Sequence, residues 1–202
     1  MTPSFSFRSL ASIVGASCLA MLLLDQPAQA HGIAQGGVAA GFLHPISGAD
    51  HLLLLIGVGA AASCISSQLL LWGLAGAMAG GVFGAMGGSL PAQELLAALA
   101  ITAVAVLALR SLGARQAPQI SGCGALVGTA VAVHAMLHGL EAPADGSAAL
   151  WWLGAFGASL LVSGGSFLLL RRLPLGLTQG LALLLALCGG VIALEPIGQL
   201  VR

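Results

Sequence analysis

The feature that most constrains the fold is a series of long apolar segments separated by only a few charged residues. Each is close to or longer than the ~20 residues that a helix needs to cross the hydrocarbon of a bilayer. In lipid, backbone polar groups must be satisfied within the segment, which favours helices. The sequence therefore predicts an all-α integral membrane protein with six transmembrane helices. The predicted spans cover residues 34–62, 68–88, 92–110, 119–141, 148–170 and 175–197.

The composition agrees with this fold class. Charged residues make up 6% of the chain, whereas about 25% is usual in a soluble domain. The formal net charge is zero, so no electrostatic argument favours a nucleic-acid partner. The expected surroundings are a lipid bilayer. A homo-oligomer is compatible with the sequence, which does not determine the oligomeric state.

The first 30 residues have the organisation of a cleavable signal peptide. Arg8 gives a weakly positive start, residues 9–24 form an apolar core, and Ala28-Gln29-Ala30 is a small-residue cleavage site. We expect cleavage after Ala30, leaving a six-span domain of residues 31–202 that begins with His31. An uncleaved first span is the alternative.

The charged residues between the spans indicate the orientation. A cleaved signal leaves the mature N-terminus outside, so six spans place loops 63–67, 110–118 and 171–174 inside. Four arginines fall in or beside the inside loops, as the positive-inside rule requires. They are Arg110, Arg115, Arg171 and Arg172. Glu141 and Asp145 fall outside. The glycine-rich second span, which includes Gly73–Gly88, predicts close helix packing.

The first span contains a polar group that is unusual at membrane depth. An ionisable side chain at mid-span costs about 2.5–3.5 kcal/mol on the insertion scale, so such residues usually face the bundle interior and have a function. His44 and His51 are seven residues apart and would share a face of a continuous helix. Asp50 could ligate a metal or orient an imidazole. Pro45 predicts a kink or a short unwound section near His44.

A second polar group lies at the outer end of the fourth span. His134 and His138 are four residues apart, and Glu141 follows three residues later, so all three lie on one stripe of a helix. The pair is not the HExxH motif of metalloproteases, because Ala135 follows His134.

The predicted topology brings the two groups to the outer half of the membrane. Imidazole with carboxylate suits nickel, cobalt and zinc. His31 would lie outside near the pore mouth, where its α-amine and imidazole could recruit metal. For any one histidine, a hydrogen-bonded structural role is the alternative. The candidate metal ligands are His31, His44, Asp50, His51, His134, His138 and Glu141.

These motifs resemble those of a known family. HPISGADH, residues 44–51, fits the H-x5-D-H signature of the HupE/UreJ family of bacterial nickel/cobalt permeases. The run HAMLHGLE, residues 134–141, resembles the family's second motif, which ends H-G-x-E, although Val133-His134-Ala135 stands where that motif opens with Phe-His-Gly. The resemblance implies a multi-pass protein of the bacterial inner membrane, in which the outside N-terminus expected from the cleaved signal would be periplasmic.

The predicted function is a secondary permease for uptake of a divalent transition metal, nickel or cobalt, through a His/Asp/Glu-lined site on the first and fourth spans. No P-loop appears in the sequence. Ni²⁺ or Co²⁺ is the transported substrate, and no resident cofactor or enzymatic activity is expected. A metal-dependent intramembrane hydrolase and a metal-binding membrane protein without transport are the alternatives. Ligand chemistry alone does not rank nickel over cobalt.

Overall fold

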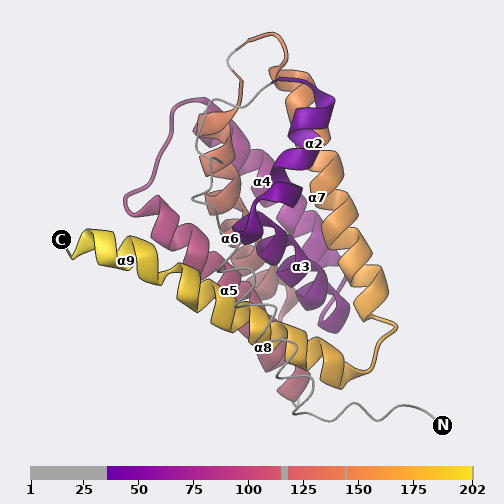
Figure 1. Ribbon diagram of the computed structural model, residues 1–202. Helices are drawn as coiled ribbons and strands as arrows, with labels where there is room; N and C mark the ends of the chain where they lie inside the picture. Colours follow the sequence, from indigo (N-terminus) through magenta and orange to yellow (C-terminus); the bar gives the residue numbers. More distant parts are fainter. Residues whose placement is uncertain (1–35, 115–117, 144, 202) are drawn as a thin grey trace.

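The computed structural model describes residues 36–114, 118–143 and 145–201, and every regular element in these ranges is a helix (Figure 1). This confirms the all-α prediction. The predicted signal peptide, His31 and Arg115 lie outside the described residues. The helices are α2 (Val38–Ser47), α3 (Ala49–Cys64), α4 (Gln68–Ala85), α5 (Gln93–Gly113), α6 (Ile120–Glu141), α7 (Ala148–Leu170), α8 (Leu175–Ile192) and α9 (Leu194–Leu200).

The protein is a multi-pass membrane protein. Within the described residues, five helical segments are long and apolar enough to cross a membrane, and α2 with α3 forms a sixth span if the bent pair is counted as one. Helices α8 and α9 together provide the last segment, Leu175–Leu200. The bounds of α4 to α7 lie within three residues of the predicted spans. Large apolar side chains are exposed on the outer surface, including Leu71, Val82, Leu153 and Leu187.

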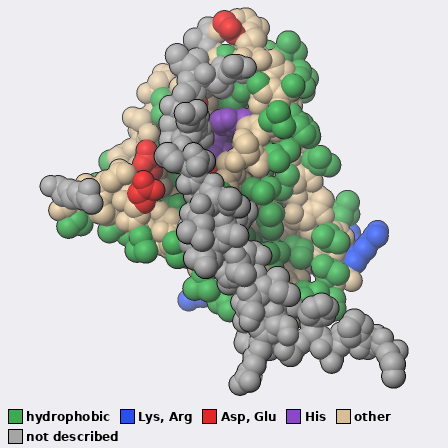
Figure 2. Space-filling model, viewed as in Figure 1, with side chains coloured by type: hydrophobic (Ala, Val, Ile, Leu, Met, Phe, Trp, Pro, Cys, Tyr) green, Lys and Arg blue, Asp and Glu red, His purple; other side chains and the backbone are tan. Residues whose placement is uncertain are grey.

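The alternating helices give the bundle two distinct ends. The α4–α5 and α6–α7 connections lie at one end, which we call the α6–α7 end. The α3–α4, α5–α6 and α7–α8 connections lie at the other, which we call the α3–α4 end. In Figure 2 the basic side chains lie toward the lower part of the molecule and the acidic side chains lie above them.

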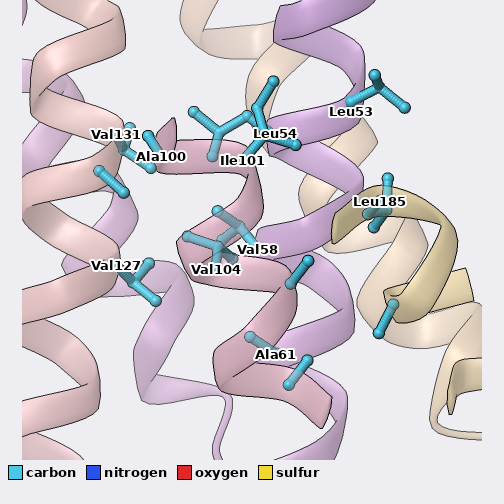
Figure 3. Packing of buried hydrophobic residues seen from close by; sticks show 14 of the residues in the cluster. Leu53, Leu54, Val58, Ala61, Ala100, Ile101, Val104, Val127, Val131 and Leu185 are labelled. Atoms are coloured by element: carbon cyan, nitrogen blue, oxygen red, sulfur yellow. The ribbon is translucent and has the colours of Figure 1, made fainter. Parts of the chain in front are cut away.

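A close-packed apolar core joins α3, α5, α6 and α8 (Figure 3). Leu54 and Val58 of α3 pack with Ile101 and Val104 of α5 and with Leu185 of α8, and all five are at most 3% exposed. This core fixes α3 against α5 along most of its length. The N-terminal turn of α3, which contains Asp50 and His51, extends beyond it toward the α6–α7 end.

Glycines bring α4 and α6 into direct backbone contact, as the glycine-rich sequence predicts. Gly76, Gly80 and Gly84 recur at every fourth residue of α4. A Cβ atom on any of them would overlap a backbone carbonyl of α6. Small residues permit such close approach where no hydrophobic force drives helices together. The contact positions α6, and with it the second polar group.

The first span is interrupted at Gly48, where α2 and α3 meet at a bend of 81°. The predicted interruption is confirmed, but it lies four residues beyond His44. Pro45 remains inside α2 and lacks the N–H that would bond to the Gly41 carbonyl. The helix continues for two more residues before Gly48 adopts extended angles, φ −82° and ψ 119°. Because the helix is not continuous, His44 and His51 lie on two different helices instead of one shared helix face.

Candidate metal centre

Three helices bring the predicted ligands together at the α6–α7 end. α2 carries His44, the first turn of α3 carries Asp50 and His51, and α6 carries the second polar group. All six predicted ligands within the described residues belong to the resulting cluster. They are His44, Asp50, His51, His134, His138 and Glu141. Histidine side chains are visible from outside on the face shown in Figure 2.

The bend at Gly48 makes this convergence possible. α2 turns away from the axis of α3 and packs against α7, where Gly41 faces the backbone of Trp151 and Gly154 faces the backbone of Val38. The ring of His44 lies against Trp151, with 5.1 Å between the ring centroids. His44 therefore approaches the cluster from the α7 side, whereas His138 approaches from α6.

One set of ligand atoms converges on His138. His44 Nε2 lies 2.8 Å and His51 Nε2 lies 3.4 Å from His138 Nδ1. Ligands at about 2.0–2.1 Å from one ion in tetrahedral geometry would be about 3.3 Å apart. His44, His51 and His138, which we call the three-histidine group, could therefore close on one ion after small adjustments. Glu141 Oε2 lies 3.7 Å from both His44 Nε2 and His138 Nδ1.

Asp50 joins two imidazoles on the other side of His51. Asp50 Oδ1 lies 2.5 Å from His51 Nδ1, and Asp50 Oδ2 lies 3.3 Å from His134 Nε2. Asp50, His51 and His134, which we call the Asp50 group, form a second set of atoms close enough to hold a metal ion. The contact with Asp50 also orients the His51 ring, so that its Nε2 faces the three-histidine group. Carboxylates commonly orient metal-binding histidines in this way.

His134 is the most enclosed histidine of the cluster. Its side chain is 5% exposed, compared with 9% for His51 and 13% for His138. Its contact with Asp50 lies within ion-pair distance but lacks hydrogen-bond geometry, and neither ring nitrogen has a hydrogen-bond partner. A buried polar atom without a partner costs about 1–3 kcal/mol. An ion bound to one of the two ring nitrogens of His134 would offset this cost for that nitrogen.

A cavity of about 80 Å³ begins at the four histidines. It continues between α3, α4, α6 and α7 toward the α3–α4 end, as far as Val58 and Leu70. Most of its lining is apolar, and the hydroxyl-bearing residues among its lining are Ser159 and Ser163 of α7. Both hydroxyls donate to carbonyls one turn earlier in the helix. The polar cluster thus lies at one end of an otherwise apolar cavity.

The contribution of α7 was not predicted from the sequence. Trp151 is 1% exposed and supports His44, and Trp152 lines the cavity. The adjacent tryptophans are visible in the sequence, but tryptophan near the end of a span is also typical of the membrane interface. In the sequence, Gly41 and Gly154 are the residues that could have indicated a close contact between α2 and α7.

One further acidic side chain lies in the α6–α7 connection. Asp145 is outside the spans and accepts hydrogen bonds from the backbone N–H and the hydroxyl of Ser147. These bonds stabilise the carboxylate and lower the pKa of Asp145 below its ordinary value. Asp145 therefore carries a negative charge at neutral pH at the same end of the bundle as Glu141.

Comparisons with known proteins identify the family of this chain. The family model described as HupE / UreJ protein matches residues 19–197. Protein HupE of Rhizobium leguminosarum bv. viciae is 33% identical over 150 residues, which cover 71% of this chain and 76% of that protein. No solved structure matches the chain at a significant level. The extent of both sequence matches shows that the chain belongs to the HupE/UreJ family.

Proposed function

We propose that this protein is a secondary permease that admits a divalent transition metal, nickel or cobalt, across the bacterial inner membrane. The observation that carries the proposal is the convergence of four imidazoles and two carboxylates at the head of a cavity inside a membrane-spanning bundle. Membership of the HupE/UreJ family supports it. Ion transport is a use that accounts for a costly polar cluster at this depth.

The ligand atoms suit the proposed substrates. Imidazole nitrogen and carboxylate oxygen bind nickel and cobalt well. Glu141 and Asp50 would offset the charge of the ion where little water remains. His44 and Glu141 lie where an ion from the α6–α7 end would arrive, and the cavity lies beyond them.

The proposed orientation places the α6–α7 end in the periplasm. Arg110 and the pair Arg171 and Arg172 lie at the opposite end, which the positive-inside rule assigns to the cytoplasm. Asp145 and Glu141 would then give the periplasmic mouth a negative charge that attracts cations. Cleavage after Ala30 would start the mature chain at His31 on the same side, and we assign His31 a role in capturing metal.

Metal accumulation in cells tests the proposal. A strain without its own nickel uptake should accumulate radiolabelled nickel or cobalt when it expresses this chain, and His51→Ala and Asp50→Ala should each abolish the gain. Thr178→Val is a matched control, because Thr178 is also a buried polar residue but lies on α8, outside the cavity lining. Immunoblots of membranes must show equal amounts of each protein.

The same assay separates the alternatives. A metal-dependent hydrolase or a metal-binding protein without transport would leave the metal content of the cells unchanged by the wild-type chain. Normal uptake by His51→Ala would show that the ion does not pass through this cluster.

A further inference from the structure

The cluster contains two overlapping sets of ligands, and His51 belongs to both. Its Nε2 faces His138 in the three-histidine group, and its Nδ1 faces Asp50 in the Asp50 group. The ligand atoms within each group lie within 4.8 Å of one another. His51 therefore stands between two candidate positions for an ion.

The two groups lie at successive depths along α6. His134 is four residues from His138, which corresponds to about 6 Å along a helix axis, and it lies farther from Glu141 and the α6–α7 end. His134 also has the smallest exposure of the cluster histidines and lines the cavity. Along α6, His134 of the Asp50 group thus lies one turn farther from the α6–α7 end than His138 of the three-histidine group, while the Asp50 carboxylate is 35% exposed and reaches this position from the side.

Sharing His51 prevents both groups from being complete at once. A neutral imidazole has one nitrogen with a free lone pair and one that carries a proton. When Nδ1–H donates to Asp50, Nε2 is the ligand and serves the three-histidine group. When Nδ1 binds an ion beside Asp50, the proton resides on Nε2. His51 carries one proton in both states: as the ion moves, Asp50 accepts the proton from Nδ1 and passes it to water at its exposed edge, and water returns a proton to Nε2.

His134 provides an independent indication that the deeper position binds an ion. Both of its ring nitrogens are buried without a hydrogen-bond partner, and Nε2 is 3.3 Å from Asp50 Oδ2. A structural histidine at this depth would be expected to form a hydrogen bond. A buried imidazole that contacts a carboxylate without hydrogen-bond geometry has instead the composition of an incomplete metal site.

We propose that the Asp50 group is a second, deeper metal site, and that one ion moves to it from the three-histidine group by exchanging the nitrogen of His51 that binds it. This inference rests on the proposed permease function. The three-histidine group captures the ion at the mouth, and the Asp50 group delivers it to the cavity. One ion occupies the pair of sites at a time.

Nickel binding to the purified full-length chain in lipid nanodiscs tests this arrangement. The wild type should bind one nickel per chain. His134→Ala removes only the deeper site and His138→Ala only the outer site, so each should still bind one nickel. His51→Ala damages both sites and should bind at least about tenfold more weakly than either, since loss of ligand support typically costs 10–100-fold in affinity.

Uptake by cells should separate the two roles. His138→Ala should raise the half-saturating nickel concentration about tenfold while saturating nickel restores most of the rate. His134→Ala should reduce the maximal rate about tenfold or more and leave nickel bound at the outer site. The X-ray absorption spectrum of the bound nickel should show more imidazole scattering in His134→Ala than in His138→Ala. His134→Gln, which keeps the buried volume, gives the same comparison where the alanine variant does not reach the membrane.

The results that would overturn the shared pair of sites are different from the result that would overturn the permease proposal. Equal loss of nickel binding in His134→Ala and His138→Ala would mean a single site formed by all the ligands. Two nickel ions bound at once to the wild type would mean independent sites. Either result rejects the shared pair of sites while leaving the permease proposal intact, whereas wild-type cells that gain no metal would reject the permease.

Discussion

At the scale of single residues, spacing predicted which side chains meet but not which atoms face one another. The four histidines, Asp50 and Glu141 were identified from two short motifs and their positions along two spans. The placement of Asp50 between His51 and His134 depends on the rotation of α3 about its own axis relative to α6. That rotation is determined by packing far from the cluster, so it could not be predicted from the residues of either motif.

Gly48 has a steric role that a substitution can isolate. Its backbone angles are accessible to any residue, but a Cβ atom there would lie 2.6 Å from His51 Nδ1 and 3.2 Å from Asp50 Oδ1. Gly48→Ala should push the His51 ring away from Asp50. We expect metal uptake to fall about tenfold or more, in line with the loss of a carboxylate that orients a ligand, while the chain still reaches the membrane.

Gly57→Ala on the same helix provides the control. A Cβ atom at Gly57 would lie 3.5 Å from Val104 Cγ1, which is an ordinary contact. This variant should transport like the wild type. Wild-type uptake by Gly48→Ala would show that transport does not need the orientation of His51 seen here.

At the scale of helices, the spans were predictable and the break within the first one only partly so. Long apolar runs with turn residues between them define α4 to α7 to within three residues. Pro45 indicated an interruption, but a proline can remain in a helix near its end, as it does here. The 81° angle arises because α2 packs on α7 through glycines distant in sequence.

The glycine contact between α4 and α6 should be essential for stability. A Leu side chain at Gly80 would collide with the Ala132 carbonyl. Because this carbonyl belongs to the backbone of α6, the collision can be relieved only if α4 and α6 move apart. Overpacking usually destabilises by about 1–3 kcal/mol, and we expect at least that for Gly80→Leu. The measurement is the melting temperature of the purified protein in detergent, together with its amount in the membrane.

Gly165→Leu is the matched comparison for this variant. Gly165 lies on α7 and is exposed, and a Cβ atom added there would meet no other atom within 4 Å. It should behave like the wild type in both measurements. Equal loss of stability in the two variants would mean that leucine destabilises the bundle at any position. The loss in Gly80→Leu would then not be due to the α4–α6 contact.

At the scale of the whole molecule, the alternation of six spans predicted that the first and fourth would carry their polar groups to the same end. The structure confirms that the two groups meet. The neighbours of each span were not predictable, because several helices are uniformly apolar and could pack in many orders. The cavity between α3, α4, α6 and α7 follows from that order.

The mature N-terminus gives a prediction about entry to the whole protein. If cleavage follows Ala30, His31 offers an α-amine and an imidazole, which have reference pKa values of about 7.7–8.0 and 6.5 and so both release protons to a metal near neutral pH. His31→Ala should impair uptake at limiting metal and recover at high metal. N-terminal sequencing must first show normal cleavage. Unchanged uptake at the lowest measurable concentration would remove His31 from the mechanism.

The cluster joins two helices, α3 and α6, whose backbones approach each other closely at few points. α4 packs extensively against α6, and α2 and α3 pack against α7, but α3 and α6 make few backbone contacts with each other. A bound ion would cross-link these two parts of the molecule. Metal at 100 times its dissociation constant would stabilise the folded state by about 2.7 kcal/mol. Nickel should therefore raise the melting temperature of the wild type, and His51→Ala should show a much smaller rise. A bound ion would then stabilise the protein through the contact between α3 and α6, in addition to its proposed role as the transported substrate.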